Sequence, residues 1–176
     1  MSDSPCTSIE TVPEFLVHAI ELETESVQRY QELADSMETH NNEEVAGLFR
    51  RLATFSEEHA DEVKARVQGQ QLPEIPPWDF KWNCPGSPES DCMEGEVSYL
   101  MTTRQALELA LHNETRGRDF YAHVAETSAN AEVQRLANEM AEEETEHVQL
   151  LQEWVEHARH LPEEPQEDMD PPNMPE

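Results

Sequence analysis

Apolar residues recur at intervals of three and four along two long, proline-free stretches of the chain, residues 14–72 and 89–161. Both stretches are rich in Glu, Ala, Leu and Gln, which favour helices, and this apolar spacing is typical of amphipathic helices. A polar cluster interrupts each stretch, at residues 35–42 and 126–130. The pattern therefore predicts two helical hairpins, with helices near residues 12–36, 43–68, 102–127 and 131–159.

The connection between the two hairpins, near residues 70–99, contains five of the twelve prolines. A helix of about 25 residues is about 37 Å long, a distance that about eleven extended residues can span. The connection is therefore long enough to cross the whole bundle. We expect an all-α, four-helix bundle in which one long crossover joins two hairpins.

The chain outside the helices divides into three parts. Residues 1–11 form an N-terminal extension to a bundle that spans residues 12–160. Residues 161–176 contain six acidic residues and five prolines, so we expect a tail that is disordered or lies over the surface. In the crossover, Trp78, Phe80 and Trp82 alternate with Asp79 and Lys81. We expect the aromatic side chains to pack on the bundle and the charged ones to point away.

The net charge of −28 narrows the range of partners. Nucleic acids and anionic membranes are bound through Lys and Arg, so neither is an expected partner, whereas cations are. The chain has no apolar run of about 18 residues and no basic, then apolar, N-terminal segment, so we expect a cytoplasmic protein. Cys6, Cys84 and Cys92 form no Cys-x-x-Cys pair, and we expect reduced thiols without a metal site.

The two hairpins repeat one pattern of residues. Glu23 precedes Tyr30 by seven positions, and Glu114 precedes Tyr121 by the same interval. In the second helix of each hairpin, the equivalent residues are Val45 and Val133, Leu48 and Leu136, Leu52 and Met140, Ser56 and Glu144, His59 and His147, and Val63 and Leu151. The chain is therefore a duplicated hairpin, in which a serine occupies the position of one glutamate.

Five polar residues of this repeat fall in the apolar stripes of the predicted helices: Glu23, His59, Glu114, Glu144 and His147. Burying a carboxylate costs several kcal/mol unless a proton, a basic residue or a cation neutralises it, and these stripes place neither Lys nor Arg nearby. Glu and His are ordinary ligands of iron or manganese. Taken singly, an inward Glu or His is more often a satisfied core residue. Five such residues at duplicated positions predict a metal site in the bundle core.

These segments resemble the rubrerythrin-like branch of the ferritin-like di-iron proteins, across residues 12–160. The resemblance rests on Glu23-x6-Tyr30, on residues 48–53 (LFRRLA) and 58–60 (EHA), on Glu114-x6-Tyr121, and on residues 144–147 (ETEH). It implies that Glu23 and Glu114 are terminal ligands, and that Glu144 bridges two iron ions. Iron is then the expected metal, with manganese or zinc as alternatives.

The chain departs from this family pattern in two respects. It has no cysteines for a rubredoxin domain, so an electron donor, if one is needed, is a separate protein. Ser56 also replaces the bridging glutamate of the first hairpin, which leaves three carboxylates to balance two divalent ions. We therefore expect the second ion to bind more weakly. Water, an exogenous anion or Glu62 are alternative replacements for the absent carboxylate.

The resemblance implies an oxidoreductase in which ferrous iron reduces hydrogen peroxide or is oxidised by peroxide or dioxygen. Tyr30 and Tyr121 would line the site, as catalytic residues or, more conservatively, as core side chains whose hydroxyl groups bond to ligand carboxylates. The alternative is a non-catalytic iron-binding or iron-handling protein with a degenerate site. A structural bundle with a relic site would leave buried carboxylates uncompensated. A homodimer is compatible with this class of fold.

Overall fold

The computed structural model describes residues 8–39, 41–67, 69–82 and 102–160, and these residues form four α-helices and one short 3-10 helix. The α-helices are α1 (Val12–Thr39), α2 (Glu43–Arg66), α3 (Thr103–Thr127) and α4 (Ala131–Arg159), and the 3-10 helix is η1 (Pro77–Asp79). The predicted all-α fold and the four predicted helices are confirmed. The cysteines and the acidic tail lie outside the described residues.

Capping residues explain where three of the helices begin. The side chains of Asn42 and Asn130 accept hydrogen bonds from backbone N–H groups in the first turns of α2 and α4. Thr102 and Gln105 form a reciprocal capping box at the start of α3. These side chains satisfy N–H groups that have no partner within the helix, so the polar clusters seen in the sequence end one helix and start the next.

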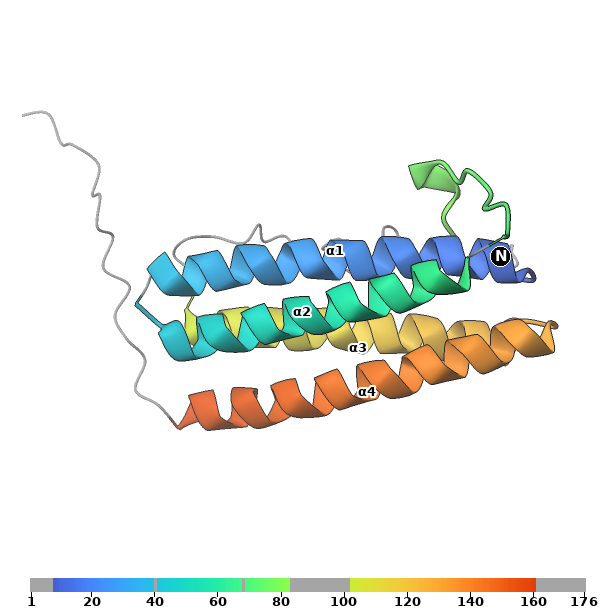
Figure 1. Cartoon of the computed structure of the whole chain (residues 1–176). Helices are drawn as coiled ribbons and strands as arrows, with labels where there is room; N and C mark the ends of the chain where they lie inside the picture. Colours follow the sequence, from blue (N-terminus) through green and yellow to red (C-terminus); the bar gives the residue numbers. More distant parts are fainter. Residues whose placement is uncertain (1–7, 40, 68, 83–101, 161–176) are drawn as a thin grey trace, which may run out of the picture.

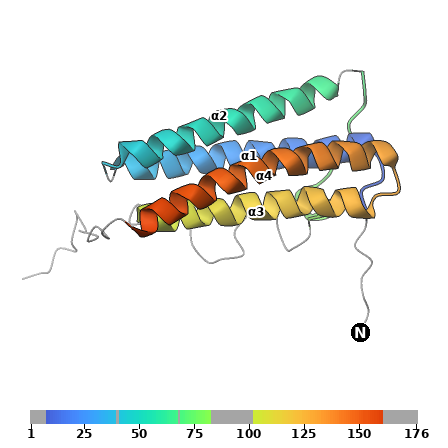
Figure 2. The same cartoon turned by 90° about the horizontal axis from the view of Figure 1, so that it is seen from below.

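α1 packs along α2, and α3 packs along α4, as the two predicted hairpins. α2 and α3 run in the same direction along the bundle, as both views show (Figure 1, Figure 2). The amide of Asn42, at the turn between α1 and α2, donates a 2.5 Å hydrogen bond to the hydroxyl of Thr103 at the start of α3. At the opposite end, the backbone N–H of Ala129 donates to Glu10 at 2.9 Å. The connection between α2 and α3 therefore crosses the length of the bundle, as in a ferritin-like fold.

The described part of the crossover is tied to α1 through a buried histidine. His18 donates from Nδ1 to the carbonyl of Glu14 and accepts at Nε2 from the backbone N–H of Lys81, each at 2.9 Å. Its ring lies against Phe80 and Trp82, with ring centroids 4.9 and 5.1 Å away. His18 was not among the residues predicted from the sequence to have a role. Its hydrogen bonds and ring contacts attach the described part of the crossover to α1.

The predicted alternation of the crossover side chains is wrong at two positions. Trp78 is 82% exposed, because η1 turns the chain and interrupts the extended geometry that alternation requires. Lys81 does not point away from the protein; its ammonium group lies 2.5 Å from the carboxylate of Glu14. Phe80 and Trp82 pack against the bundle as expected.

The apolar core is divided into two clusters along the bundle axis. One cluster joins the C-terminal parts of α1 and α4 to the N-terminal parts of α2 and α3, and includes Leu33, Phe49 and Leu107. The other lies toward the opposite end of the bundle and includes Phe15 and Phe120. The buried polar residues predicted from the repeat lie between the two clusters along the sequence of each helix. No helix of the described residues is long and apolar enough to span a membrane.

Candidate metal centre

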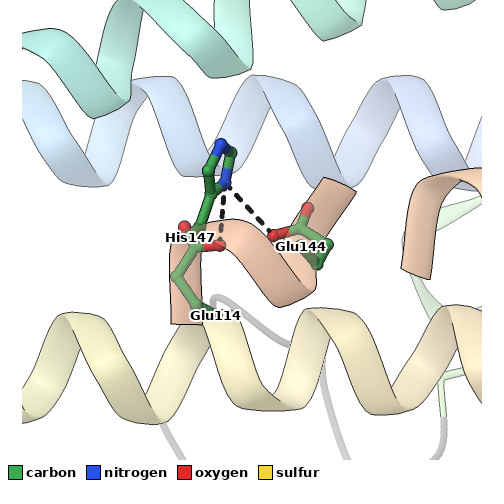
Figure 3. A group of neighbouring side chains, drawn as sticks. All are labelled: Glu114, Glu144 and His147. Carbon is green, nitrogen blue, oxygen red and sulfur yellow. Dashed lines mark hydrogen bonds and ion pairs between the residues drawn. The ribbon is translucent and has the colours of Figure 1, made fainter. Parts of the chain in front are cut away.

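Glu114, Glu144 and His147 form a compact group in the middle of the bundle (Figure 3). All three are buried, with exposed fractions of 3%, 5% and 7%. Nδ1 of His147 lies 3.2 Å from Glu114 Oε2 and 3.5 Å from Glu144 Oε2. Glu144 and His147 are three residues apart on α4, so both point into the bundle from one face toward the carboxylate of α3.

Glu23 and His59 lie beside this group, from α1 and α2. Glu23 is 1% exposed, and its Oε2 atom lies 3.9 Å from Nδ1 of His59. The imidazole rings of His59 and His147 stack face to face, with centroids 5.4 Å apart and planes within 14° of parallel. The structure therefore brings all five predicted ligands together, one carboxylate or imidazole from each of α1, α2 and α3 and two from α4.

The two tyrosines of the repeat bond across the bundle. The hydroxyl of Tyr30 on α1 donates to Glu114 on α3, and that of Tyr121 on α3 donates to Glu23 on α1 at 3.2 Å. Both tyrosine rings are buried. Each hairpin thus orients the carboxylate of the other, which matches the conservative role expected for these tyrosines.

Burial and hydrogen bonding together set the pKa values at the site. Burial by itself would raise the pKa of Glu114, but hydrogen bonds from Glu144, His147 and Tyr30 outweigh it and hold the pKa below its ordinary value. Burial by itself would lower the pKa of His147, but its hydrogen bond to Glu114 and the charge of that carboxylate raise it. Burial and the negative charge of Glu23 raise the pKa of Tyr121, so its hydroxyl group keeps its proton near neutral pH.

The donor set fits a metal ion. Two bonds of about 2.1 Å that meet at 90° or more place their donor atoms about 3.0–4.2 Å apart. The separations at the site, 3.2, 3.5 and 3.9 Å, fall in this range. Nδ1 of His59 is buried and makes no hydrogen bond to the described residues, so this nitrogen is available for a ligand bond. A cation in the same space would balance the charge of the three buried carboxylates.

The first hairpin fits its predicted geometry less well than the second. His59 was expected to point inward but is 17% exposed, and the neighbouring Phe55 is 39% exposed. The reason is that Ser56, Ala60 and Val63 take the inward face of α2, and Phe55 and His59 lie on its flank toward α4. Ser56 is buried, and Glu62, one alternative for the absent carboxylate, is exposed.

Glu143 was not among the residues predicted from the sequence to form the site. Its Oε2 atom lies 3.8 Å from Nε2 of His59, and the side chain is 38% exposed. The sequence signal that could have identified Glu143 is its spacing of four residues from Glu139 and from His147, which places all three on one edge of α4. Each of them contacts a residue of α2: Glu139 contacts Arg66, Glu143 contacts His59, and His147 contacts Phe55. This row lies on one edge of α4, where a residue one position before an inward ligand faces the neighbouring helix.

Comparisons with known proteins agree with the fold and the repeat. The rubrerythrin family model matches residues 14–75 and 105–171. The crystal structure of an uncharacterized conserved protein from Magnetospirillum magnetotacticum MS-1 is 44% identical to this chain, with a TM-score of 0.71, and the match covers 84% of this chain and 95% of that chain. A search of curated proteins finds no match. The family model spans most of the chain and all four helices, so the chain belongs to the rubrerythrin family.

Proposed function

We propose that this protein binds iron through Glu23, His59, Glu114, Glu144 and His147, and acts as an oxidoreductase on hydrogen peroxide or dioxygen. The observation that carries the proposal is the convergence of three carboxylates and two imidazoles, from four helices, on one buried space. A buried set of this composition is stable when a divalent cation balances its charge. Manganese and zinc are alternative occupants, because they accept the same donor atoms.

Bound ferrous iron would supply the electrons that reduce peroxide to water. The residues of the chain hold and orient the ligands. Tyr30 and Tyr121 donate hydrogen bonds to Glu114 and Glu23, which fixes the direction in which each carboxylate presents its other oxygen. Burial and the charge of Glu23 raise the pKa of Tyr121, so in the metal-free protein its hydroxyl group keeps its proton and donates to Glu23 near neutral pH. The two apolar clusters exclude bulk water from the two ends of the site along the bundle axis, whereas His59 remains 17% exposed on the flank between α2 and α4.

Reduction of one peroxide molecule to two water molecules consumes two electrons and two protons. Nδ1 of His147 would have to be free of a proton in order to hold a metal ion, and any proton on it would pass to solvent. Repeated turnover needs a reductant, and a separate electron-donor protein fits this need. The acidic surface of the chain, with a net charge of −28, would favour a donor with a basic docking face.

A second candidate function is iron binding or iron handling without turnover. It is favoured by the buried serine at position 56, where the repeat predicts a carboxylate. A site with one carboxylate fewer holds its second ion less strongly. A single ferrous ion that is oxidised to the ferric state delivers only one of the two electrons that the reduction of peroxide requires. Both candidates require metal binding, and they differ in peroxide consumption.

Metal analysis followed by a peroxide assay tests the proposal. Protein loaded with ferrous iron without oxygen should consume peroxide in the presence of a reductant, and Glu144→Ala should lose both iron and activity. Glu142→Gln, an exposed neutral substitution on the same helix, is the matched control and should keep both. Iron binding without peroxide consumption would support the second candidate. A wild-type protein that binds no metal would refute both.

A further inference from the structure

Glu143 and His59 face each other across the interface between α2 and α4. The carboxylate of Glu143 lies 3.8 Å from Nε2 of His59, whereas Nδ1 of the same ring faces Glu23 on the inner side, 3.9 Å away. The imidazole thus stands between an inner carboxylate, which is 1% exposed, and an outer one, which is 38% exposed. The two ring nitrogens therefore meet different surroundings.

The two nitrogens would take different roles when a metal ion is bound. A neutral imidazole carries one N–H group and one lone pair, so a ring that held a metal through Nδ1, on the side of Glu23, would carry its proton on Nε2. That N–H group would then point toward the carboxylate of Glu143. Because the Glu143 side chain is partly exposed, it has the freedom to close the distance of 3.8 Å to a hydrogen bond when the ring becomes a ligand.

The charge of Glu143 also bears on the missing carboxylate. Glu23, Glu114 and Glu144 leave one positive charge uncompensated on a pair of divalent ions, and Ser56 contributes none. A carboxylate that bonds to the outer nitrogen of a ligand imidazole adds its negative charge next to the ion. Glu143 has a carboxylate on that side of the ring, 3.8 Å from Nε2 of His59.

In the opposite half of the site, both close carboxylates among the described residues face Nδ1 of His147, on the inner side, and the charge of Glu143 acts on this ring only from a longer distance. In the repeat, Phe55 of α2 occupies the position equivalent to Glu143 of α4, and its ring stacks on His147 at a centroid distance of 5.8 Å. His147 instead bonds through Nδ1 to Glu114 within the site. The half of the site formed by Glu23 and His59 lacks an inner carboxylate at Ser56. It is also the half that has an outer carboxylate, that of Glu143.

We propose that Glu143 is a positioning residue that replaces, from outside the site, the carboxylate absent at Ser56. It accepts the Nε2 proton of His59, fixes Nδ1 toward the metal, and supplies the fourth negative charge of a two-ion site. This inference rests on the proposed metal-binding function, and it concerns only the position formed by Glu23 and His59.

Ferrous titration without oxygen tests the inference, with Glu143→Gln compared with Glu142→Gln. Each variant removes one negative charge from adjacent positions of α4, but Glu142 is exposed. Loss of a carboxylate that orients a ligand histidine weakens metal binding by about 10- to 100-fold. We expect that loss for the second ion in Glu143→Gln, an unchanged first ion, and wild-type behaviour for Glu142→Gln.

Two further measurements separate positioning from a general effect on folding. Ser56→Glu added to Glu143→Gln should restore the affinity for the second ion, because a carboxylate returns to the cluster. Nitrogen NMR of zinc-loaded protein should find the Nε2–H proton of His59 hydrogen-bonded in the wild type and in faster exchange with solvent in Glu143→Ala. Equal affinities in the two glutamine variants, or equal weakening of both ions, would overturn the inference. A wild type that binds no metal would instead refute the proposed function.

Discussion

Ser56→Glu is the most informative single substitution in this site. Ser56 is 2% exposed and lies on the inward face of α2, one turn before His59. The substitution restores the pattern of the second hairpin, in which Glu144 precedes His147 by three residues. It should strengthen binding of the second ion, because a fourth carboxylate balances two divalent ions.

The metal-free protein should lose stability in the same variant. A fully buried glutamate has a pKa of up to about 8–9, so at pH 7 it takes up a proton on folding. From an unfolded pKa of about 4.3, this costs about 1.4 kcal/mol per pH unit, or about 4 kcal/mol at pH 7. For a chain of this size, the melting temperature should fall by about 8–15 °C.

The way in which the stability of the metal-free Ser56→Glu variant changes with pH shows whether a buried carboxylate causes the loss. The pKa of the new glutamate is raised in the folded state, so its cost is absent below the unfolded pKa and grows as the pH rises toward the folded pKa. Ser56→Gln is the matched control, since it has nearly the same volume and carries no charge. The two variants should melt together near pH 4 and diverge by pH 7.

Calorimetry of both variants, with and without ferrous iron under anaerobic conditions, provides the measurement. Iron should recover the stability of Ser56→Glu and leave Ser56→Gln with the weak second ion of the wild type. Equal melting temperatures at pH 7, together with equal metal stoichiometry, would mean that residue 56 does not face the metal. The repeat alignment that places Ser56 opposite Glu144 would then be wrong.

Two further predictions concern the histidines. His147→Ala should remove more metal than His59→Ala, because His147 lies within hydrogen-bond distance of Glu114 and beside Glu144; metal analysis that finds equal losses would contradict this asymmetry. Burial lowers the pKa of His18 in the folded protein, so His18 should stabilise the fold above pH 6.5. This contribution should be lost as the pH falls through the folded pKa of His18. Subtracting the stability curve of His18→Phe from that of the wild type isolates this effect, and a difference that is constant from pH 7 to 4 would contradict it.

The sequence by itself determined the helices and the direction of most ligands. The 3.6-residue period is a local property of the backbone, so it fixes which face of its own helix each side chain occupies. Glu23, Glu114, Glu144 and His147 could therefore be identified as inward residues, and all four are buried. The long proline-rich connection likewise predicted a crossover, because chain length limits the distance that it can span.

Only the tertiary structure decided which side chains meet between helices. The helical period gives the angle of a side chain around the axis of its own helix. It does not give the spacing between neighbouring helices or the residue of the neighbouring helix that lies opposite that side chain. Glu143 and His59 meet because they lie on the facing edges of α2 and α4, and Tyr30 reaches Glu114 because α1 and α3 lie within reach across the bundle core. Trp78 became exposed because a short 3-10 turn interrupts the crossover. Such contacts depend on how whole helices pack and how loops turn, which a single helical or extended period does not encode.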